Sequence, residues 1–303
     1  MGSVDTVSRR FSDLVNYVES TKFRGFDVSR TKKAFVHCKD KSMLFQIPRR
    51  YWEMSSIEET KAHQIATNTP DKFIQFNKRN LVRVYPKGTR LLSSNFDPLP
   101  MWLMGCQMVA LNYQAGDREL MFNRAMFRQN GRCGYILKPS FLRGAETGKY
   151  VVAKCSIPDL VRSFADGKFS PDSEPRRLRI KIVSGQHLPK SEQRIKGDII
   201  EPYVKVRVRG CPQDEDEYVT KVVPKVVKAA PIKKKTPAQS SRDLVFSQNG
   251  FNPIWNEAAV FDVHHPDLAF VEFKVKSQEG TAQLDEHLGS YVIPFHLMRS
   301  GYR

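Results

Sequence analysis

The chain has 303 residues, of which 40% are apolar and 27% are charged. This length suffices for two ordinary domains, and this apolar share can fill packed cores, which argues against wholesale disorder. No apolar run approaches the roughly 20 residues that a membrane-spanning helix needs. Residues 1–10 contain no apolar secretory segment, so we expect neither a membrane-spanning nor a secreted protein.

The charge of the chain is strongly positive. Forty-nine Lys and Arg residues against 32 Asp and Glu residues give a formal net charge of +17. Such a chain attracts polyanions, among them nucleic acid, anionic lipid and phosphorylated ligands. No recognition motif for nucleic acid accompanies the charge, so we expect no nucleic-acid partner. The five cysteines are scattered without a CxxC pair, which argues against disulfides and structural zinc and indicates a reducing compartment.

Residues 11–143 alternate between strand patterns and helix patterns. Three apolar runs have the length of strands: residues 14–18 (LVNYV), 80–85 (NLVRVY) and 108–113 (MVALNY). Between the first two, Ser55 and Glu58 have the spacing of a capping box, which predicts a helix from this point to about Ile65. Strands separated by helices favour an α/β arrangement.

The second half of the chain has a different pattern. Residues 144–175 carry Gly, Ser, Asp and Pro without a period and predict an interdomain linker. After it, apolar and polar residues alternate strictly in three segments: residues 178–182, 203–208 and 271–275. Strict alternation predicts half-buried antiparallel strands. Together with the turn dipeptides Asn249-Gly250 and Asn252-Pro253, this pattern predicts an all-β sandwich.

One segment interrupts the predicted sandwich. Residues 214–217 are all acidic, and residues 221–242 contain seven cations and no acid. Prolines and like charges predict a mobile insertion near residues 212–243 rather than a strand pair. The insertion is either a solvated, self-repelling loop or an electrostatic tether to an anionic membrane. The membrane-binding residues of the second interpretation are Lys233, Lys234 and Lys235.

Several sequence blocks occur in a fixed order in the first half. They are residues 84–90 (VYPKGTR), 93–98 (SSNFDP), 105–114 (GCQMVALNYQ) and 134–139 (GYILKP). In this order they resemble the Y region of eukaryotic phosphoinositide-specific phospholipase C, and residues 11–17 (FSDLVNY) and 53–56 (EMSS) extend the resemblance. The segments YPKGTR and SDLVNYV are most similar to the β class of this family. Residues 178–186 (LRIKIVSGQ) and 249–256 (NGFNPIWN) resemble the C2-type domain that follows this region.

The resemblance implies a fold: half of a TIM-like (β/α) barrel followed by a C2-type β-sandwich. Residues 1–143 are then the Y half of the catalytic barrel, residues 144–175 the linker, and residues 176–303 the sandwich, cut short at its C-terminus. A closed barrel needs eight strands, so a half leaves two unpaired edges. We therefore expect a C-terminal piece of a larger enzyme whose X half is missing.

The resemblance also implies an activity. The family cleaves phosphatidylinositol 4,5-bisphosphate to diacylglycerol and inositol 1,4,5-trisphosphate in lipid signalling, and the X half supplies the catalytic groups and the ligands of Ca²⁺. We therefore expect no catalytic residue and no metal ligand in this chain. Carried over by position, Ser56 and Arg83 hold a ring phosphate and Tyr85 lies against the inositol ring. Arg83 and Tyr85 are two apart on one predicted strand, so their side chains point the same way.

Two positions depart from the pattern of the family. Thr89 stands where some classes place a tryptophan of the membrane-dipping ridge, so we expect that anchor to be missing. Glu201 and residues 277–279 (SQE) offer too few carboxylates for the Ca²⁺ loops of a C2 domain, so we expect a sandwich that does not bind Ca²⁺. His264 and His265 fall at the end of a predicted strand and are expected to be structural.

The implied location is cytoplasmic, at the inner face of the plasma membrane. The implied partners are phosphatidylinositol 4,5-bisphosphate, an anionic membrane surface, the X half of the barrel and heterotrimeric G-protein subunits. An alternative stays open: a catalytically inactive fragment that acts as a phosphoinositide-binding, membrane-binding or regulatory module. The presence or absence of an X half distinguishes the two.

Overall fold

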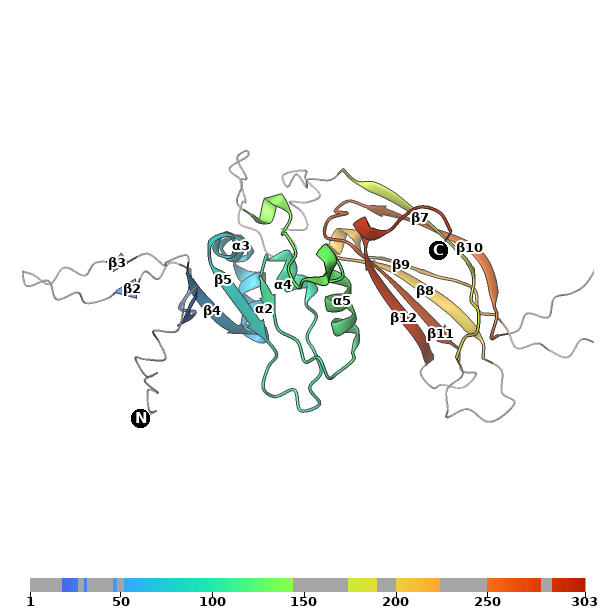
Figure 1. Cartoon of the computed structure of the whole chain (residues 1–303), viewed down its shortest axis with the longest axis horizontal. Coiled ribbons are helices and arrows are strands. Elements are labelled where there is room, and N and C mark those ends of the chain that lie inside the picture. The colour runs from blue at the N-terminus through green and yellow to red at the C-terminus, as the bar shows by residue number, and fades with distance from the viewer. Residues whose placement is uncertain are drawn as a thin grey trace, which may run out of the picture. The chain divides into compact units, whose positions relative to one another are not determined.

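A computed structural model describes residues 18–26, 30–31, 46–47, 52–143, 174–189, 200–223, 250–278 and 285–302. The chain divides into two compact units, Met1–Asp172 and Ser173–Arg303, coloured blue to green and yellow to red in Figure 1. Most of the predicted linker and the three lysines of the proposed tether lie outside the described residues. In the described segments, no helix combines the length and the apolar character needed to cross a membrane.

The first unit contains a four-stranded parallel sheet in the order β1-β4-β5-β6. Its strands are β1 (Glu19–Lys22), β4 (Glu53–Glu58), β5 (Leu81–Tyr85) and β6 (Met108–Val109). A short antiparallel hairpin, β2 (Arg30–Thr31) and β3 (Gln46–Ile47), lies between β1 and β4 in the sequence. The strands of the sheet follow one another in chain order, as they do in half of an α/β barrel. Among the described strands, β1 and β6 form its two edges.

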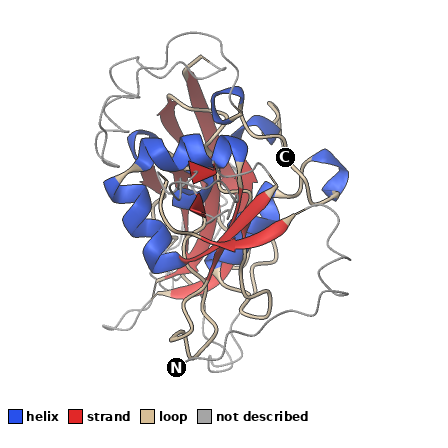
Figure 2. Cartoon of the chain, turned by 90° about the vertical axis from the view of Figure 1, so that its left-hand side faces the viewer, coloured by secondary structure: helices blue, strands red, loops and turns tan. Residues whose placement is uncertain are grey.

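Helices connect the strands and cover one face of the sheet. They are α2 (Glu59–Asn68), α3 (Pro70–Arg79), α4 (Leu99–Leu103) and α5 (Arg118–Met126), with 3₁₀ turns η1 (Asn130–Arg132) and η2 (Ser140–Leu142). Helix α2 packs against β4 and β5. Helices are drawn in blue and strands in red in Figure 2. Ile57, Val82 and Val84 are fully buried, whereas the residues that alternate with them along each strand are more exposed. The sheet thus has a covered face and an open face.

The predicted helix start at Ser55 is wrong. Ser55 lies inside β4 and pairs with Val82 of β5, and α2 begins only at Glu59, without a side-chain cap. The pairing of β4 with its neighbours outweighs a local capping signature, because tertiary contacts routinely override such weak preferences. The predicted strand 108–113 is also shorter than expected. It ends at Val109, and the chain then turns so that the Asn112 N–H donates to the Asn95 side chain.

The second unit is a sandwich of two antiparallel sheets, one in the order β12-β11-β8-β9 and one formed by β10 and β7. The strands are β7 (Arg176–Ser184), β8 (Pro202–Arg209), β9 (Asp216–Val219), β10 (Ile254–Val263), β11 (Phe270–Ser277) and β12 (Glu286–Pro294). Two 3₁₀ turns, η3 (Pro212–Asp214) and η4 (Phe295–Leu297), complete the unit. The three alternating segments of the sequence lie within β7, β8 and β11, as predicted.

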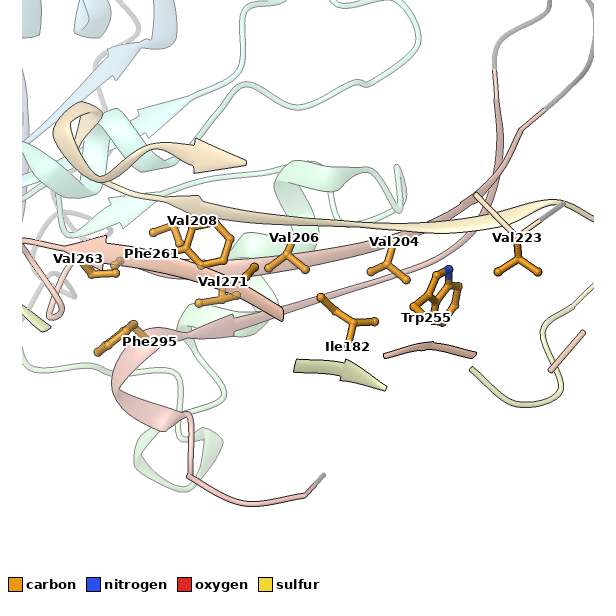
Figure 3. Packing of buried hydrophobic residues seen from close by; sticks show 12 residues of the cluster. Ile182, Val204, Val206, Val208, Val223, Trp255, Phe261, Val263, Val271 and Phe295 are labelled. Carbon is orange, nitrogen blue, oxygen red and sulfur yellow. The ribbon is translucent and has the colours of Figure 1, made fainter. Parts of the chain in front are cut away.

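The core of the sandwich forms from the inward residues of both sheets (Figure 3). Val223 and Trp255 lie at one end of this core, and Val263 and Phe295 lie at the other. The indole N–H of Trp255 donates to the carbonyl of Pro202 at 3.4 Å, so the ring is both packed and hydrogen-bonded.

The acidic residues expected in the insertion belong to the sandwich instead. Strand β9 pairs with β8, where Glu217 forms ion pairs with Lys205 and Arg207, and Glu215 forms one with Arg209. Opposite charges across neighbouring strands stabilise such a pair. Asp214 is buried, and its carboxylate accepts the backbone N–H groups of His264 and His265 in the connection between β10 and β11. Residues 212–219 therefore do not form the predicted loop but a 3₁₀ turn and a strand, and the rest of the predicted insertion beyond residue 223 lies outside the described residues.

Candidate functional site

The three residues predicted to hold a headgroup lie together on the open face of the parallel sheet. Ser56 and Arg83 are direct register partners on β4 and β5, and neighbouring strands lie about 4.8 Å apart. The guanidinium carbon of Arg83 lies 5.4 Å from the ring centroid of Tyr85, two residues further along β5. The predicted common direction of Arg83 and Tyr85 is thereby confirmed.

None of these three side chains is used to fill the core. Arg83 is exposed, and Ser56 and Tyr85 are half-buried, whereas the alternate positions Ile57 and Val84 are buried under the helices. The strands end just beyond this point, so the three residues lie toward the carboxyl ends of β4 and β5. Loops at that end of a parallel barrel build its binding sites.

The loop that follows β5 is fixed to the start of α2 by an ion pair. Arg90 Nε and Nη2 donate to Glu59 Oε1 and Oε2, each at 2.6 Å, and the Lys87 N–H donates to Oε1 at 2.6 Å. Hydrogen bonding from Arg90 holds the pKa of the Glu59 carboxyl below its usual value, although burial opposes the shift. Because a forked Arg–carboxylate pair sets both distance and orientation, it positions the loop relative to the strands.

A second group of hydrogen bonds joins this loop to the loop after β6. The Asn95 side chain donates to the Asn112 carbonyl at 3.0 Å and to Asp117 at 2.9 Å. Asp117 also accepts the N–H of Leu120 at 3.1 Å and so caps α5. One carboxylate therefore ties together two loops at the carboxyl end of the sheet and the helix that follows.

The loop after β5 exposes two apolar side chains that the sequence analysis missed. Leu91 is 94% exposed and Leu92 is 92% exposed, directly after the anchored Arg90. Large apolar side chains exposed side by side often mark a surface that meets another apolar phase. Thr89, which stands where some classes of the family carry a tryptophan, is exposed and polar. The missed signal is the pair of leucines in a short polar loop directly after a strand.

The described part of the open face does not form a Ca²⁺ site. Among the described residues on that face, Glu58 supplies a carboxylate beside Ser56, and Ca²⁺ requires six to eight oxygen ligands. We therefore assign no step of the chemistry to a metal held by these residues.

A buried group in the sandwich has the composition of a metal site. Ligand atoms of Cys211, Asp214 and His265 lie within 4.8 Å of one another. Both oxygens of Asp214 already accept backbone N–H groups, from His264 at 2.7 Å and from His265 at 2.9 Å. Burial raises the pKa of the Cys211 thiol and lowers that of His265, so both side chains favour their neutral forms. Thiol and imidazole are poor ligands for Ca²⁺, and the carboxylate joins η3 to the connection between β10 and β11, which is a structural role.

Comparison with known proteins identifies both units. Residues 11–141 match the family described as "Phosphatidylinositol-specific phospholipase C, Y domain", and residues 176–230 and 226–302 match "C2 domain". The chain belongs to the phosphatidylinositol-specific phospholipase C family. The two C2 matches meet at residues 226–230, inside the segment where the sequence predicts an insertion.

Relatives of this phospholipase C chain extend over nearly its whole length. The Xenopus laevis protein "1-phosphatidylinositol 4,5-bisphosphate phosphodiesterase delta-4" is 34% identical over 99% of the chain and 33% of its own length. The human "Inactive phospholipase C-like protein 1" is 34% identical over 97% of the chain and 22% of its own length. The chain thus spans a third or less of these relatives.

A solved structure supports the fold. The crystal structure of L. pealei PLC21 is 30% identical and superposes with a TM-score of 0.68, over 98% of this chain and 30% of that one. The predicted half barrel followed by a C2-type sandwich is confirmed. The resemblance to the β class stays a prediction, because the matched domains do not specify a class.

Proposed function

We propose that this chain recognises the headgroup for a phosphoinositide phospholipase C that hydrolyses phosphatidylinositol 4,5-bisphosphate to diacylglycerol and inositol 1,4,5-trisphosphate. The observation that carries the proposal is the placement of Ser56, Arg83 and Tyr85 together on the open face of the half barrel. The guanidinium of Arg83 offers a forked set of donors that matches a phosphate. The hydroxyl of Ser56 adds a donor beside it, and the ring of Tyr85 offers a flat apolar surface to the inositol ring.

The general acid, the general base and Ca²⁺ belong, in this proposal, to an X half that closes the barrel. The reaction moves a proton to the leaving alcohol and takes one from the attacking hydroxyl, which requires groups that titrate near neutral pH. The described open face presents Arg83, Tyr85 and one carboxylate, Glu58, but no histidine. The role of the chain is therefore to bind and orient the headgroup.

Membrane docking in this proposal uses the loop after β5. Leu91 and Leu92 lie in the loop that follows the strand carrying Arg83, so insertion of the two leucines into the lipid would bring the headgroup site to the surface of the bilayer. Transfer of a leucine side chain from water to an apolar phase contributes about 1.5–3 kcal/mol. The exposed Lys87 adds attraction to an anionic leaflet. The three lysines of the insertion supply a second, electrostatic contact from the C2 unit.

A second function is supported by the names of some relatives. Proteins called "Inactive phospholipase C-like" match this chain as well as those named as phosphodiesterases do, at 34% identity. In that case the same headgroup site serves binding or regulation without turnover. G-protein subunits as partners remain a proposal from the family resemblance.

Reassembly with an X half distinguishes the two functions. We expect the chain by itself to release no inositol phosphate from vesicles at any Ca²⁺ concentration, because its described open face lacks a titrating acid–base pair. Addition of the X half of a relative should produce inositol 1,4,5-trisphosphate, measured by chromatography of the soluble products. A complex that forms, binds the lipid and releases no product would favour the inactive module.

The ion pair between Glu59 and Arg90 predicts a stability that depends on pH. Glu59→Gln should lower the free energy of unfolding at pH 7 by about 1–3 kcal/mol, since a buried charged hydrogen bond is lost. The folded-state pKa of Glu59 is lowered, so its contribution is complete above its unfolded pKa of about 4.3 and is lost as the pH falls through the folded value.

Urea unfolding of the chain and of the variant at pH 7 and at pH 3 measures this effect. The difference between the two proteins should shrink at the lower pH. Glu58→Gln, a change at the neighbouring position on the open face, is the matched control and should alter stability little. If the difference in free energy of unfolding between the wild-type chain and Glu59→Gln stays constant with pH, the carboxylate charge is not what holds the loop.

A further inference from the structure

Lys22 lies at the same level of the sheet as the two residues that hold phosphate in the proposed function. It is the last residue of β1, and its register partner on β4 is Ser56. Ser56 is in turn the partner of Arg83 on β5. The three residues therefore form one row across three adjacent strands, and the spacing between strands places the Cα atoms of Lys22 and Arg83 about 10 Å apart.

The side chain of Lys22 belongs to the open face. The next residue, Phe23, is 6% exposed, and its ring lies 5.6 Å from the ring of Phe76 in α3, on the covered side of the sheet. Successive residues of a strand point to opposite faces, so Lys22 points away from the helices. It is exposed, and no described carboxylate forms an ion pair with it.

The row has the chemistry of a site for two phosphates. A single phosphate is satisfied by the fork of Arg83 and the hydroxyl of Ser56. A second cation on the far side of Ser56 matches a second phosphate on the neighbouring carbon of the same ring, because a lysine ammonium on its flexible stem can reach across the width of one strand. In this row of described residues, Lys22 is the cation on the side of Ser56 opposite to Arg83.

We infer that Lys22 binds the second of two vicinal phosphates on the inositol ring and thereby favours bisphosphorylated over monophosphorylated headgroups. This inference rests on the proposed function, since it places a further residue in the same site. The shared chemistry is a vicinal bisphosphate, which occurs both in a lipid headgroup and in a soluble inositol phosphate.

Calorimetric titration of the full chain with two soluble probes tests the contact. Inositol 1,4,5-trisphosphate has the vicinal pair, and inositol 1,4-bisphosphate lacks one member of it. Lys22→Gln should weaken binding of the trisphosphate by about tenfold, as expected for loss of one charged hydrogen bond, and should change binding of the bisphosphate less than twofold. Lys22→Arg keeps the cation and should retain the binding. Lys61→Gln removes the same charge from the covered side, where its ammonium lies over Phe23, and is the matched control.

Arg83→Ala separates failure of this inference from failure of the proposed function. If Arg83→Ala weakens trisphosphate binding and Lys22→Gln does not, Lys22 has no such role and the headgroup site stands. If the wild-type chain binds neither probe, or if neither variant has an effect, both proposals are wrong. Equal losses of affinity for the two probes would show that Lys22 attracts anions in general and would overturn the inference.

A lipid assay separates the two sources of the ligand. In the enzyme reassembled with an X half, Lys22→Gln should lower kcat/KM for phosphatidylinositol 4,5-bisphosphate by about tenfold relative to phosphatidylinositol 4-phosphate. A loss seen with the soluble trisphosphate alone would assign Lys22 to a free inositol phosphate. The absence of a selective loss in both assays would contradict the inference.

Discussion

Replacement of Arg83 by alanine is expected to lower kcat/KM for phosphatidylinositol 4,5-bisphosphate by about 10- to 150-fold in an enzyme assembled from this chain and an X half. This range corresponds to one charged hydrogen bond of about 1.5–3 kcal/mol. The loss should be small with unphosphorylated phosphatidylinositol, because Arg83 contacts a ring phosphate in the proposal and takes no part in proton transfer. Initial rates on mixed vesicles of each lipid measure the ratio.

The control for this experiment is Arg79→Ala. Arg79 is an exposed arginine at the end of α3, just before β5, and should leave both rates unchanged. Arg83 is itself exposed, so its truncation is not expected to unfold the chain. Equal losses of Arg83→Ala on both lipids would mean that Arg83 supports the barrel and does not read the headgroup.

Replacement of Leu91 and Leu92 by serine is expected to weaken vesicle binding by about 100-fold, since the two leucines together contribute at least about 3 kcal/mol when transferred into lipid. The loss should persist at high salt, because burial of apolar surface is not screened by ions. Sedimentation of the chain with phosphatidylcholine vesicles that contain anionic lipid measures it. Leu137→Ser, at an exposed leucine of the same unit, is the matched control and should bind normally.

The lysines of the insertion should contribute to vesicle binding in a way that depends on salt, unlike the two leucines. Lys233, Lys234 and Lys235 changed together to glutamine should cost at most about 3 kcal/mol at low salt, at roughly 1 kcal/mol each. This loss should fade as salt shortens the Debye length below about 8 Å. Vesicle binding that survives both sets of changes and appears only with Ca²⁺ would show that the C2 unit binds through a metal loop instead.

The convergence of Ser56, Arg83 and Tyr85 could be predicted only in part. Alternation along residues 80–85 showed that Arg83 and Tyr85 share a face, and family resemblance placed Ser56 in the same site. The register that sets Ser56 opposite Arg83 is a property of the pairing of β4 with β5, and the two strands are separated in the sequence by α2 and α3, so the pattern of either strand alone does not show it. The row that adds Lys22 depends on a further strand pairing and was not visible in the sequence.

The errors of the sequence analysis share a physical cause. Ser55 and Glu58 satisfy a local rule for a helix start, but their backbone pairs with strands far away in the sequence. The acidic run that begins at Asp214 has the composition of a loop, yet Glu217 meets Lys205 and Arg207 across a strand pair. A short stretch of sequence around either segment does not include the strand with which that segment pairs. The exposure of Leu91 and Leu92 was missed for the same reason, because the sequence does not show which leucines of a loop are buried in a core.

Chemical-shift mapping by NMR can show whether the open face of the half barrel binds an inositol phosphate. Titration of the labelled chain with inositol 1,4,5-trisphosphate should move the backbone amides of Ser56, Arg83 and Tyr85 most, with smaller changes in the loop that follows Tyr85. The main competing anion surface is the cationic strand β8, whose Lys205, Arg207 and Arg209 are already paired with acids of the same unit. Shifts confined to β8, with none on β4 and β5, would show that the open face is not the binding site.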